Sequence, residues 1–418
     1  MKPLPWWREP TRAQWVSFTA AWLGWVLDAF DFTIFLLVMP EISKEFGATQ
    51  TMTAGIITLT LLVRLAGGYF AGIAADRWGR KLPLMLSLLW FAVCDGAIAF
   101  AGSFTTVMVL RTLFGFGMGA EWTAGTTLAM ENWPKRSRGI ASGILQGSWA
   151  VGYLLAGLVS SWVVPAYGWR ALFICAAAPA LLVLPIRIWV PESEEWKARR
   201  GAKTTRAPLP GFSAPILKRM AWASLVMALG FGGYYGLTGM YPTMLKTELG
   251  LSAVETGHIV ALFNIGMMIG AVACGIAASK KSITLAIVVP ALAVLPVLPL
   301  YVGQSAEHIA LGALLGGAFG AGYSGVTPIL LTSLFPAEVR ARAIGVVYHV
   351  GAFGAAFVPI GIAALAENTG ASLALSIAGV VAACEIALIA LLATGRLEAE
   401  VSDAPRIAAS GSEREVAG

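Results

Sequence analysis

Two aspartates lie three residues apart in the segment WVLDAFDFTIF (25–35), inside an apolar stretch that runs from about 18 to 39. An ionised carboxylate in a lipid-facing helix costs roughly 2.5–3.5 kcal/mol on insertion scales. Side chains at positions i and i+3 share one face of a helix, so Asp28 and Asp31 point the same way. Buried acids in membrane helices mark proton or ion pathways, and we therefore expect one of these two carboxyl groups to exchange a proton and the other to pair with an arginine; which does which stays open.

Two arginines, Arg64 and Arg111, also lie inside apolar stretches. At about 1.5 Å per residue, Asp31 and Asp28 lie about 12 and 16 Å below the outer helix ends, and Arg111 and Arg64 lie about 10 and 18 Å below theirs. Depth therefore pairs Asp31 with Arg111 and Asp28 with Arg64. The guanidinium group binds a carboxylate in a bidentate manner and stays protonated, so we predict that these arginines bind an anionic substrate. Structural salt bridges between helices are the alternative.

Further polar residues in apolar stretches are candidates for the same site. Glu121 is predicted to be a proton relay or a partner for a neighbouring helix. His349 is predicted to be a proton carrier, although a lone histidine on an apolar helix also suits a hydrogen-bonded packing role. Asp95 and Glu385 lie on stretches expected to be peripheral. Asp95 is assigned a structural role, and Glu385 either a structural role or one in which it partly snorkels to the lipid headgroups. The predicted substrate-binding residues, besides the arginines, are Gln146, Tyr234, Tyr235, Tyr241 and Asn264.

The composition defines the elements that must position these residues. Of 418 residues, 57% are hydrophobic and 12% are charged, against about 25% charged in a soluble domain. Mean hydropathy is +0.75. The net charge of +6 comes from basic residues between apolar runs, which indicates membrane topology rather than nucleic-acid binding. The four cysteines have no paired spacing, so no disulfide and no metal site is predicted, and nothing indicates a cofactor.

Apolar runs of about 20 residues predict an all-α polytopic membrane protein with twelve transmembrane helices. If the N-terminus is cytoplasmic, 24 of the 29 Lys and Arg residues face the cytoplasm, which places both termini there. The predicted spans are roughly 15–39, 52–75, 82–102, 104–130, 138–163, 169–190, 218–245, 253–278, 282–303, 307–334, 340–366 and 370–394.

The spans divide into two halves that repeat. The predicted division is an N-terminal six-helix half (1–190), a cytoplasmic linker (191–217), a C-terminal six-helix half (218–396) and a disordered tail (397–418). At an offset of about 202 residues, Pro134, Arg138 and Gly143 match Pro336, Arg340 and Gly345, in that order. Two pseudo-symmetric halves are typical of secondary transporters, which place their site between the repeats at mid-depth. Arg111 has no charged counterpart in the second half, which favours a functional role for it.

The glycine-rich segment GFGGYYGLTGMYPTML (230–245) predicts a broken helix in the seventh span. The segment GGAFGAGYSGVTP (316–328) predicts comparable irregularity in the tenth. Close helix packing through small residues is the alternative for both segments.

The loop GIAADRWGRK (72–81) resembles the signature between the second and third helices of the major facilitator superfamily. The segments PKRSRG after the fourth span and PESEEW after the sixth are similar to other landmarks of that superfamily. Segments 5–32, 111–122 and 131–143 resemble the sialic acid and lactate/pyruvate proton symporters, and the D-x-F-D element resembles the aromatic-acid proton symporters. The resemblance implies the major facilitator fold and carriage of organic anions together with protons.

Charged residues at the predicted cytoplasmic ends are expected to control opening. We predict that Glu131 pairs with Arg77, Arg80 or Arg138 and holds the inner gate shut in the outward-open state. The gating candidates are Asp76, Arg77, Arg80, Glu131, Arg138 and Arg340.

We expect a monomeric multi-pass carrier of the plasma (inner) membrane, not an enzyme, that imports a small organic anion with H+ by alternating access. Sialic acid carriers of the branch tend to have extra membrane sequence in the middle, and the 27-residue linker leaves no room for it. The linker therefore favours a monocarboxylate such as lactate or pyruvate over sialic, sugar or aromatic acids. Two competing functions are a drug/H+ antiporter, which the two arginines disfavour, and a non-transporting carboxylate sensor, for which the predicted tail is too short.

Overall fold

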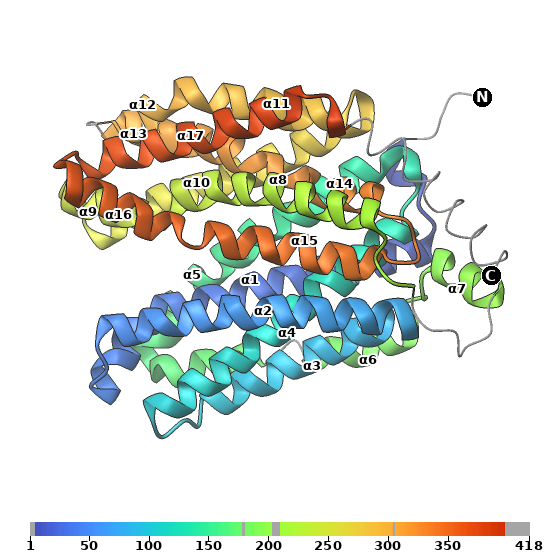
Figure 1. The fold of residues 1–418 in the computed structure, drawn as a ribbon. Coiled ribbons are helices and arrows are strands. Elements are labelled where there is room, and N and C mark those ends of the chain that lie inside the picture. The colour runs from blue at the N-terminus through green and yellow to red at the C-terminus, as the bar shows by residue number, and fades with distance from the viewer. Residues whose placement is uncertain (1–4, 178–179, 203–209, 304–305, 398–418) are drawn as a thin grey trace. The chain divides into compact units, whose positions relative to one another are not determined.

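The computed structural model describes residues 5–177, 180–202, 210–303 and 306–397, and every regular element in these ranges is a helix (Figure 1). Two predicted segments lie outside the described ranges. They are the tail beyond Leu397, which we predict to be disordered, and residues 203–209 of the predicted linker. Helices occupy all twelve predicted stretches, which confirms the all-α fold.

The first six predicted spans correspond to six helices that follow a short 3-10 turn, η1 (Trp6–Arg8). The sequence explains their ends: a capping box at Thr11 begins α1, and Gly47 ends it in the left-handed conformation with φ of 62°. Gly168, with φ of 74°, kinks α5 between the fifth and sixth predicted spans. The helices are α1 (Arg12–Phe46), α2 (Gln50–Trp78), α3 (Lys81–Ile98), α4 (Phe104–Asn132), α5 (Arg138–Ala176, after the 3-10 turn η2, Lys135–Ser137) and α6 (Ala180–Trp189).

The later spans are more broken, as their glycines and prolines predict. The seventh span is divided between α8 and α9, next to Gly239, and the tenth changes from α-helix to a π turn (η4) and a 3-10 turn (η5). After the linker helix α7 (Glu194–Ala202), the elements are α8 (Ala214–Gly239), α9 (Tyr241–Thr247), α10 (Ala253–Lys280), α11 (Ile283–Val294), η3 (Leu295–Val297), α12 (Leu298–Tyr301), α13 (Ala306–Gly316), η4 (Gly317–Ala321), η5 (Gly322–Val326), α14 (Thr327–Leu334), α15 (Arg340–Ala355), α16 (Val358–Thr369) and α17 (Leu373–Ala393).

Within the described residues, ten stretches are long and apolar enough to cross a membrane. The two predicted spans outside this group are α4, which carries Arg111, Glu121 and Glu131, and the sixth span, of which residues 178–179 lie outside the described ranges. The chain is therefore a multi-pass membrane protein.

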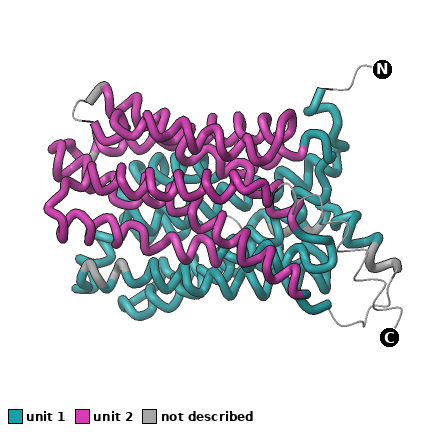
Figure 2. Tube along the Cα trace, turned by 45° about the horizontal axis from the view of Figure 1, so that its top comes forward, with its two compact units in different colours: residues 1–137, 148–213, 335–349 teal, residues 138–147, 214–334, 350–418 magenta. Residues whose placement is uncertain are grey.

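The chain divides into two compact units (Figure 2). Unit 1 holds residues 1–137, 148–213 and 335–349, and unit 2 holds residues 138–147, 214–334 and 350–418. The segments 138–147 and 335–349 thus lie in the unit built mainly from the other part of the sequence. When 138–147 is shifted by the 202 residues of the repeat, it falls within 335–349. Equivalent segments of the two halves are therefore exchanged between the units.

Helices α2 and α4 of unit 1 touch backbone to backbone through glycine. A Cβ atom on Gly67 would lie 2.0 Å from the carbonyl oxygen of Phe116, and one on Gly119 would lie 2.1 Å from that of Arg64. Small residues at such crossings let membrane helices approach closely. This contact fixes Arg64 on α2 and Glu121 on α4 at neighbouring positions within unit 1.

Candidate functional site

Arg64 is the buried cation of unit 1 whose donors are least satisfied. Arg64 is 4% exposed. Its guanidinium carbon lies 5.8 Å from the centre of the Trp25 ring and 5.7 Å from that of the Tyr348 ring. Nε and Nη2 have no hydrogen-bond partner among the described residues. Buried polar groups in native proteins are normally hydrogen-bonded, so these two donors call for a ligand.

Two carboxyl groups accompany Arg64. Asp28 on α1 is fully buried, and neither of its oxygens has a partner in the described part of the chain. Gly24 makes room for Glu121, because a Cβ atom there would lie 2.4 Å from Oε1 of Glu121. The charge of Arg64 acts on both carboxyl groups, and Asp28 also interacts with Glu121. Sequence reasoning paired Arg64 with Asp28 but did not place Glu121 beside them.

Arg111 has a different environment from Arg64. Its Nη1 donates to Oδ1 of Asp95 at 3.0 Å, and its Nη2 donates to the backbone carbonyl of Asp31 at 2.7 Å. Its guanidinium carbon lies 3.9 Å from the centre of the Phe114 ring. The depth estimate thus places Arg111 beside Asp31, but the ion-pair partner is Asp95, which we expected to be peripheral. The Asp31 carboxyl group interacts electrostatically with both Asp95 and Arg111.

His349 lies against the same part of unit 1. Its Nε2 is 3.2 Å from the carbonyl oxygen of Gly119, whereas its Nδ1 has no partner within the described ranges. Gly68 leaves room for the His349 ring, because a Cβ atom at this position would lie 2.1 Å from Cδ2 of His349. The charge of Arg64 acts on this ring as well.

Aromatic rings form a wall that sequence reasoning mostly missed. Trp122 stacks on Tyr348 with ring centres 3.4 Å apart, and Trp25 lies 6.3 Å from Trp122 and 4.9 Å from Trp149. Nε1 of Trp25 is a further buried donor without a partner among the described residues. A signal was present, because Trp25 lies three residues before Asp28 and Trp122 directly follows Glu121.

The predicted substrate-binding residues of unit 2 are described by themselves. Tyr241 packs against Tyr301 with ring centres 3.9 Å apart, and its buried hydroxyl has no partner in the described part of the chain. Nδ2 of Asn264 donates to the carbonyl of Val260 in its own helix at 2.9 Å. Tyr234 and Tyr235 are half-buried on α8, with ring centres 5.4 Å apart. Gln146, buried near the start of α5, also belongs to this unit.

The gating candidates of unit 1 form an ion-pair network around Glu131. Arg80 donates to both oxygens of Glu131 at 2.9 Å, and Arg340 donates to Oε1 at 3.0 Å. Arg340 also contacts Glu195, and the hydroxyl of Ser193 donates to Oε2 of Glu131 at 2.5 Å. Although burial acts to lower it, the pKa of Arg80 is raised, because the carboxylates of Glu131 and Asp76 stabilise the charge.

The remaining gating candidates are placed differently. Arg77 is exposed, with its guanidinium carbon 5.7 Å from the centre of the Trp78 ring, and Arg138 belongs to unit 2. Oδ2 of Asp76 accepts from Nε of Arg342 at 3.0 Å and from its backbone N–H at 3.3 Å. Sequence reasoning did not single out Arg342.

Unit 2 contains a contact equivalent to that between Asp76 and the backbone N–H of Arg342. Ser279 takes the place of Asp76 in the repeat, and its Oγ accepts from the backbone N–H of Ile140 at 3.0 Å. Ile140 corresponds to Arg342 at the 202-residue offset. In each unit, therefore, a short oxygen-bearing side chain accepts from a backbone N–H near the N-terminus of the exchanged helix.

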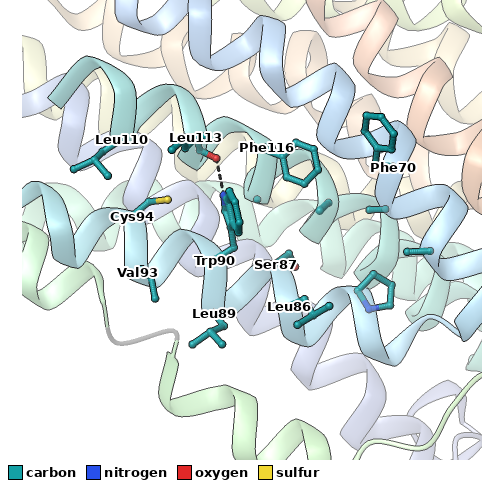
Figure 3. A pocket seen from close by; sticks show the side chains of 15 residues that line it. Phe70, Leu86, Ser87, Leu89, Trp90, Val93, Cys94, Leu110, Leu113 and Phe116 are labelled. Atoms are coloured by element: carbon teal, nitrogen blue, oxygen red, sulfur yellow. Dashed lines mark hydrogen bonds between the residues drawn. The ribbon is translucent and has the colours of Figure 1, made fainter. Parts of the chain in front are cut away.

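A large pocket of unit 1 lies elsewhere, between α2, α3 and α4 (Figure 3). It has a volume of about 730 Å³ and an almost entirely apolar lining that includes Phe70, Val93 and Phe116. The indole N–H of Trp90 in its wall donates to the carbonyl of Leu113 at 2.8 Å. Because no charged residue lines this pocket, it does not suit an organic anion.

Comparisons with known proteins address the family and the fold of this chain. The sequence profile described as Major Facilitator Superfamily matches residues 21–307. The cis,cis-muconate transport protein of Acinetobacter baylyi is 32% identical over 84% of this chain and 88% of that protein. The sialic acid transporter NanX of Escherichia coli is 29% identical over 85% of this chain and 88% of that protein. The solved structure of the proton:xylose symporter XylE, at 17% identity, covers 91% of this chain and 95% of that chain with a TM-score of 0.79.

Proposed function

Because this chain belongs to the Major Facilitator Superfamily, we propose that it is a proton-coupled symporter of an organic acid, with Arg64 as the residue that binds the carboxylate. The carrier imports the acid across the inner membrane by alternating access, and both of its termini face the cytoplasm. The expectation that the chain is not an enzyme agrees with its family.

The two free donors of Arg64 carry this proposal. Nε and Nη2 form one edge of the guanidinium, which is the edge that a carboxylate meets in a bidentate pair. Arg111 lacks this capacity, since its donors are engaged by Asp95 and by the backbone of Asp31. We therefore assign substrate binding to Arg64 and a structural role, which holds helices together, to Arg111.

Charge balance around Arg64 supports coupling to a proton. One guanidinium neutralises one of the two carboxylates, Asp28 and Glu121, so the other is most stable as the neutral acid. When a substrate carboxylate binds Arg64, it replaces the protein carboxylate as the counter-ion of the guanidinium. The carboxylate that was paired before then takes up a proton, which gives one proton per bound carboxylate. We assign the relay of this proton to His349, because the charge of Arg64 acts on its ring and its Nδ1 has no partner among the described residues.

The aromatic wall favours an acid larger than lactate or pyruvate. Trp25 and Tyr348 flank Arg64, and flat rings of this kind stack on conjugated or aromatic acids. Two relatives are named for larger acids, muconate and sialic acid. The linker-length argument for a small monocarboxylate is wrong, because this chain aligns with 88% of the sialic acid transporter. We propose unsaturated or aromatic carboxylates as the substrate class.

Uptake into proteoliposomes tests the function. We expect an inward proton gradient to accelerate uptake of radiolabelled 4-hydroxybenzoate or cis,cis-muconate, with lactate and sialic acid as competitors and xylose as a neutral control. Uptake that ignores the gradient would contradict symport. Acceleration by an outward proton gradient would indicate an antiporter, and binding without any flux would indicate a sensor.

The residue assignment is tested on the same vesicles. Arg64→Gln removes a charged hydrogen-bond donor worth about 1.5–3 kcal/mol, so we expect substrate affinity to fall about 10- to 150-fold. Arg12→Gln, at an exposed arginine at the start of α1, is the matched control and should keep its affinity. Equal affinity of the Arg64→Gln and wild-type proteins would overturn the assignment.

A further inference from the structure

Glu385 occupies the centre of the buried face of α17. Apart from Ser376, the buried residues of this helix recur every three or four positions and form one helical stripe: Ala374, Ile377, Val381, Glu385, Leu388 and Leu392. Glu385 is the one ionisable residue in that stripe, and its exposed fraction is 0%. The side chain therefore does not reach the lipid headgroups, and the idea that it snorkels does not fit.

Glycines of α8 provide the space for this side chain. A Cβ atom on Gly233 would lie 2.2 Å from Oε1 of Glu385, and one on Gly232 would lie 2.9 Å from Sγ of Cys384. A Cβ atom on Gly236 would meet Val381 at 2.7 Å. The glycine-rich run of α8 is thus shaped around α17, and the carboxyl group of Glu385 fills one of the gaps.

Among the described residues, nothing compensates the charge of this carboxyl group: neither oxygen has a hydrogen-bond partner there, and no cation acts on it. The groups that face it are the Tyr323 hydroxyl from η5 and the Cys384 thiol of its own helix. The Tyr323 hydroxyl donates instead to the carbonyl of Gly230 at 2.5 Å.

The other described elements packed on α17 place no charge beside the Glu385 carboxyl group. Lys218 and Arg219 lie near the start of α8, where Arg219 donates to the carbonyl of Leu334. Glu248, directly after α9, accepts from the backbone N–H groups of Leu373 and Ala374 at the start of α17. Helix α11 carries no ionisable side chain. Glu367 on α16 is exposed near the end of that helix, as is Lys246 on α9. Tyr241 on α9 is stacked on Tyr301. A buried carboxylate without a partner is strongly disfavoured and becomes neutral instead.

We propose that Glu385 is a second proton-binding site of this carrier, formed within unit 2 and separate from the carboxyl groups around Arg64. The carboxyl group holds its proton while it is seated against Gly233. When it loses the proton, the carboxylate leaves this seat, because solvation is its only route to stabilisation, and the contact between α17 and the glycine-rich run of α8 loosens. The site stands on the burial and packing of Glu385 and does not require the proposed substrate.

Infrared spectroscopy of the reconstituted full-length protein tests the site without any substrate. At neutral pH, the wild-type minus Glu385→Gln difference spectrum should contain the carbonyl band of a protonated carboxylic acid, and this band should convert to carboxylate bands as the pH is raised. Glu367→Gln, the exposed glutamate of α16, is the control and should remove carboxylate bands at neutral pH. If Glu385→Gln does not fold, Glu385→Leu replaces it.

Carboxylate bands in the Glu385 difference spectrum at neutral pH would overturn the proposal, as would an acid band that no alkaline pH converts. The linked movement is read from alkylation of Cys384 after the other three cysteines are replaced. The ratio of the rate with Glu385 to that with Glu385→Gln should be near one at acidic pH and rise several-fold at alkaline pH. A ratio that stays flat would overturn the movement of α17.

Discussion

We assign opposite roles to two buried arginines of unit 1 because their neighbours differ. Arg111 has a carboxylate, a backbone carbonyl and the face of Phe114, which together satisfy a guanidinium. Arg64 has ring faces and two carboxyl groups that do not bond to it. A satisfied arginine holds helices together, whereas an unsatisfied one is available to a ligand.

The pair Arg111–Asp95 makes a prediction that separates these roles. Arg111→Leu leaves Asp95 buried and unpaired, which should lower the stability of the folded protein by about 3–5 kcal/mol. The double variant Arg111→Leu with Asp95→Leu removes both charges and should recover most of that loss, as measured by thermal unfolding in detergent. Because neither residue binds substrate in our assignment, the double variant should also keep its uptake. A stable double variant without substrate binding would move the carboxylate site to Arg111.

At the scale of the elements, helices cross where the repeat places glycine. A Cβ atom on Gly345 of α15 would lie 2.4 Å from the carbonyl oxygen of Gly68 on α2. At the equivalent crossing in unit 2, a Cβ atom on Gly143 of α5 would lie 2.3 Å from the carbonyl oxygen of Ala271 on α10. The exchanged segments are thus held by contacts that tolerate no side chain.

Gly345→Ala should weaken the contact of α15 with α2. Overpacking costs about 1–3 kcal/mol, which corresponds to a shift of about 5- to 150-fold in the equilibrium of the contact. A cysteine introduced by Ala341→Cys, a fully buried position, reports the opening through faster alkylation once the four native cysteines are replaced. Gly354→Ala on the same helix meets its nearest neighbour at 3.8 Å and should leave the rate unchanged. Equal rates in both variants would show that the crossing does not control access.

Periodic and local signals allowed most of the elements to be predicted. Apolar runs gave twelve helical stretches, and the glycines and prolines near Gly239 and Gly317 marked where two of them break. Which helix contacts which depends on interactions between residues far apart in the chain. The pairs Asp95–Arg111 and Asp76–Arg342 are of this kind, so no local pattern revealed them.

The same limit applies to the candidate site. Polar residues in apolar stretches identified Asp28, Arg64, Glu121 and His349, because ionisable groups are rare there. The rings around them were missed because a tryptophan in a membrane helix is not unusual by itself. Only the fold brings Tyr348, which is distant in sequence, beside Arg64 and Trp122.

At the scale of the whole molecule, the charge carried per cycle follows from the balance around Arg64. One proton per bound carboxylate makes transport of a monoanion such as 4-hydroxybenzoate electroneutral. Its accumulation in proteoliposomes should not respond to a potassium diffusion potential set with valinomycin. A dianion such as cis,cis-muconate would instead carry one net negative charge with a single proton.

An inside-negative potential of 100 mV opposes that charge by about 2.3 kcal/mol, so it should lower the accumulation ratio of the dianion by up to about 50-fold. The monoanion in the same vesicles is the control, since it shares every step except the second carboxylate. If the potential lowered the accumulation of the monoanion as strongly as that of the dianion, the carrier would move more charge per cycle than the balance around Arg64 predicts. Should it depress neither, a second proton accompanies the dianion, and Glu385→Gln would then show whether unit 2 supplies it.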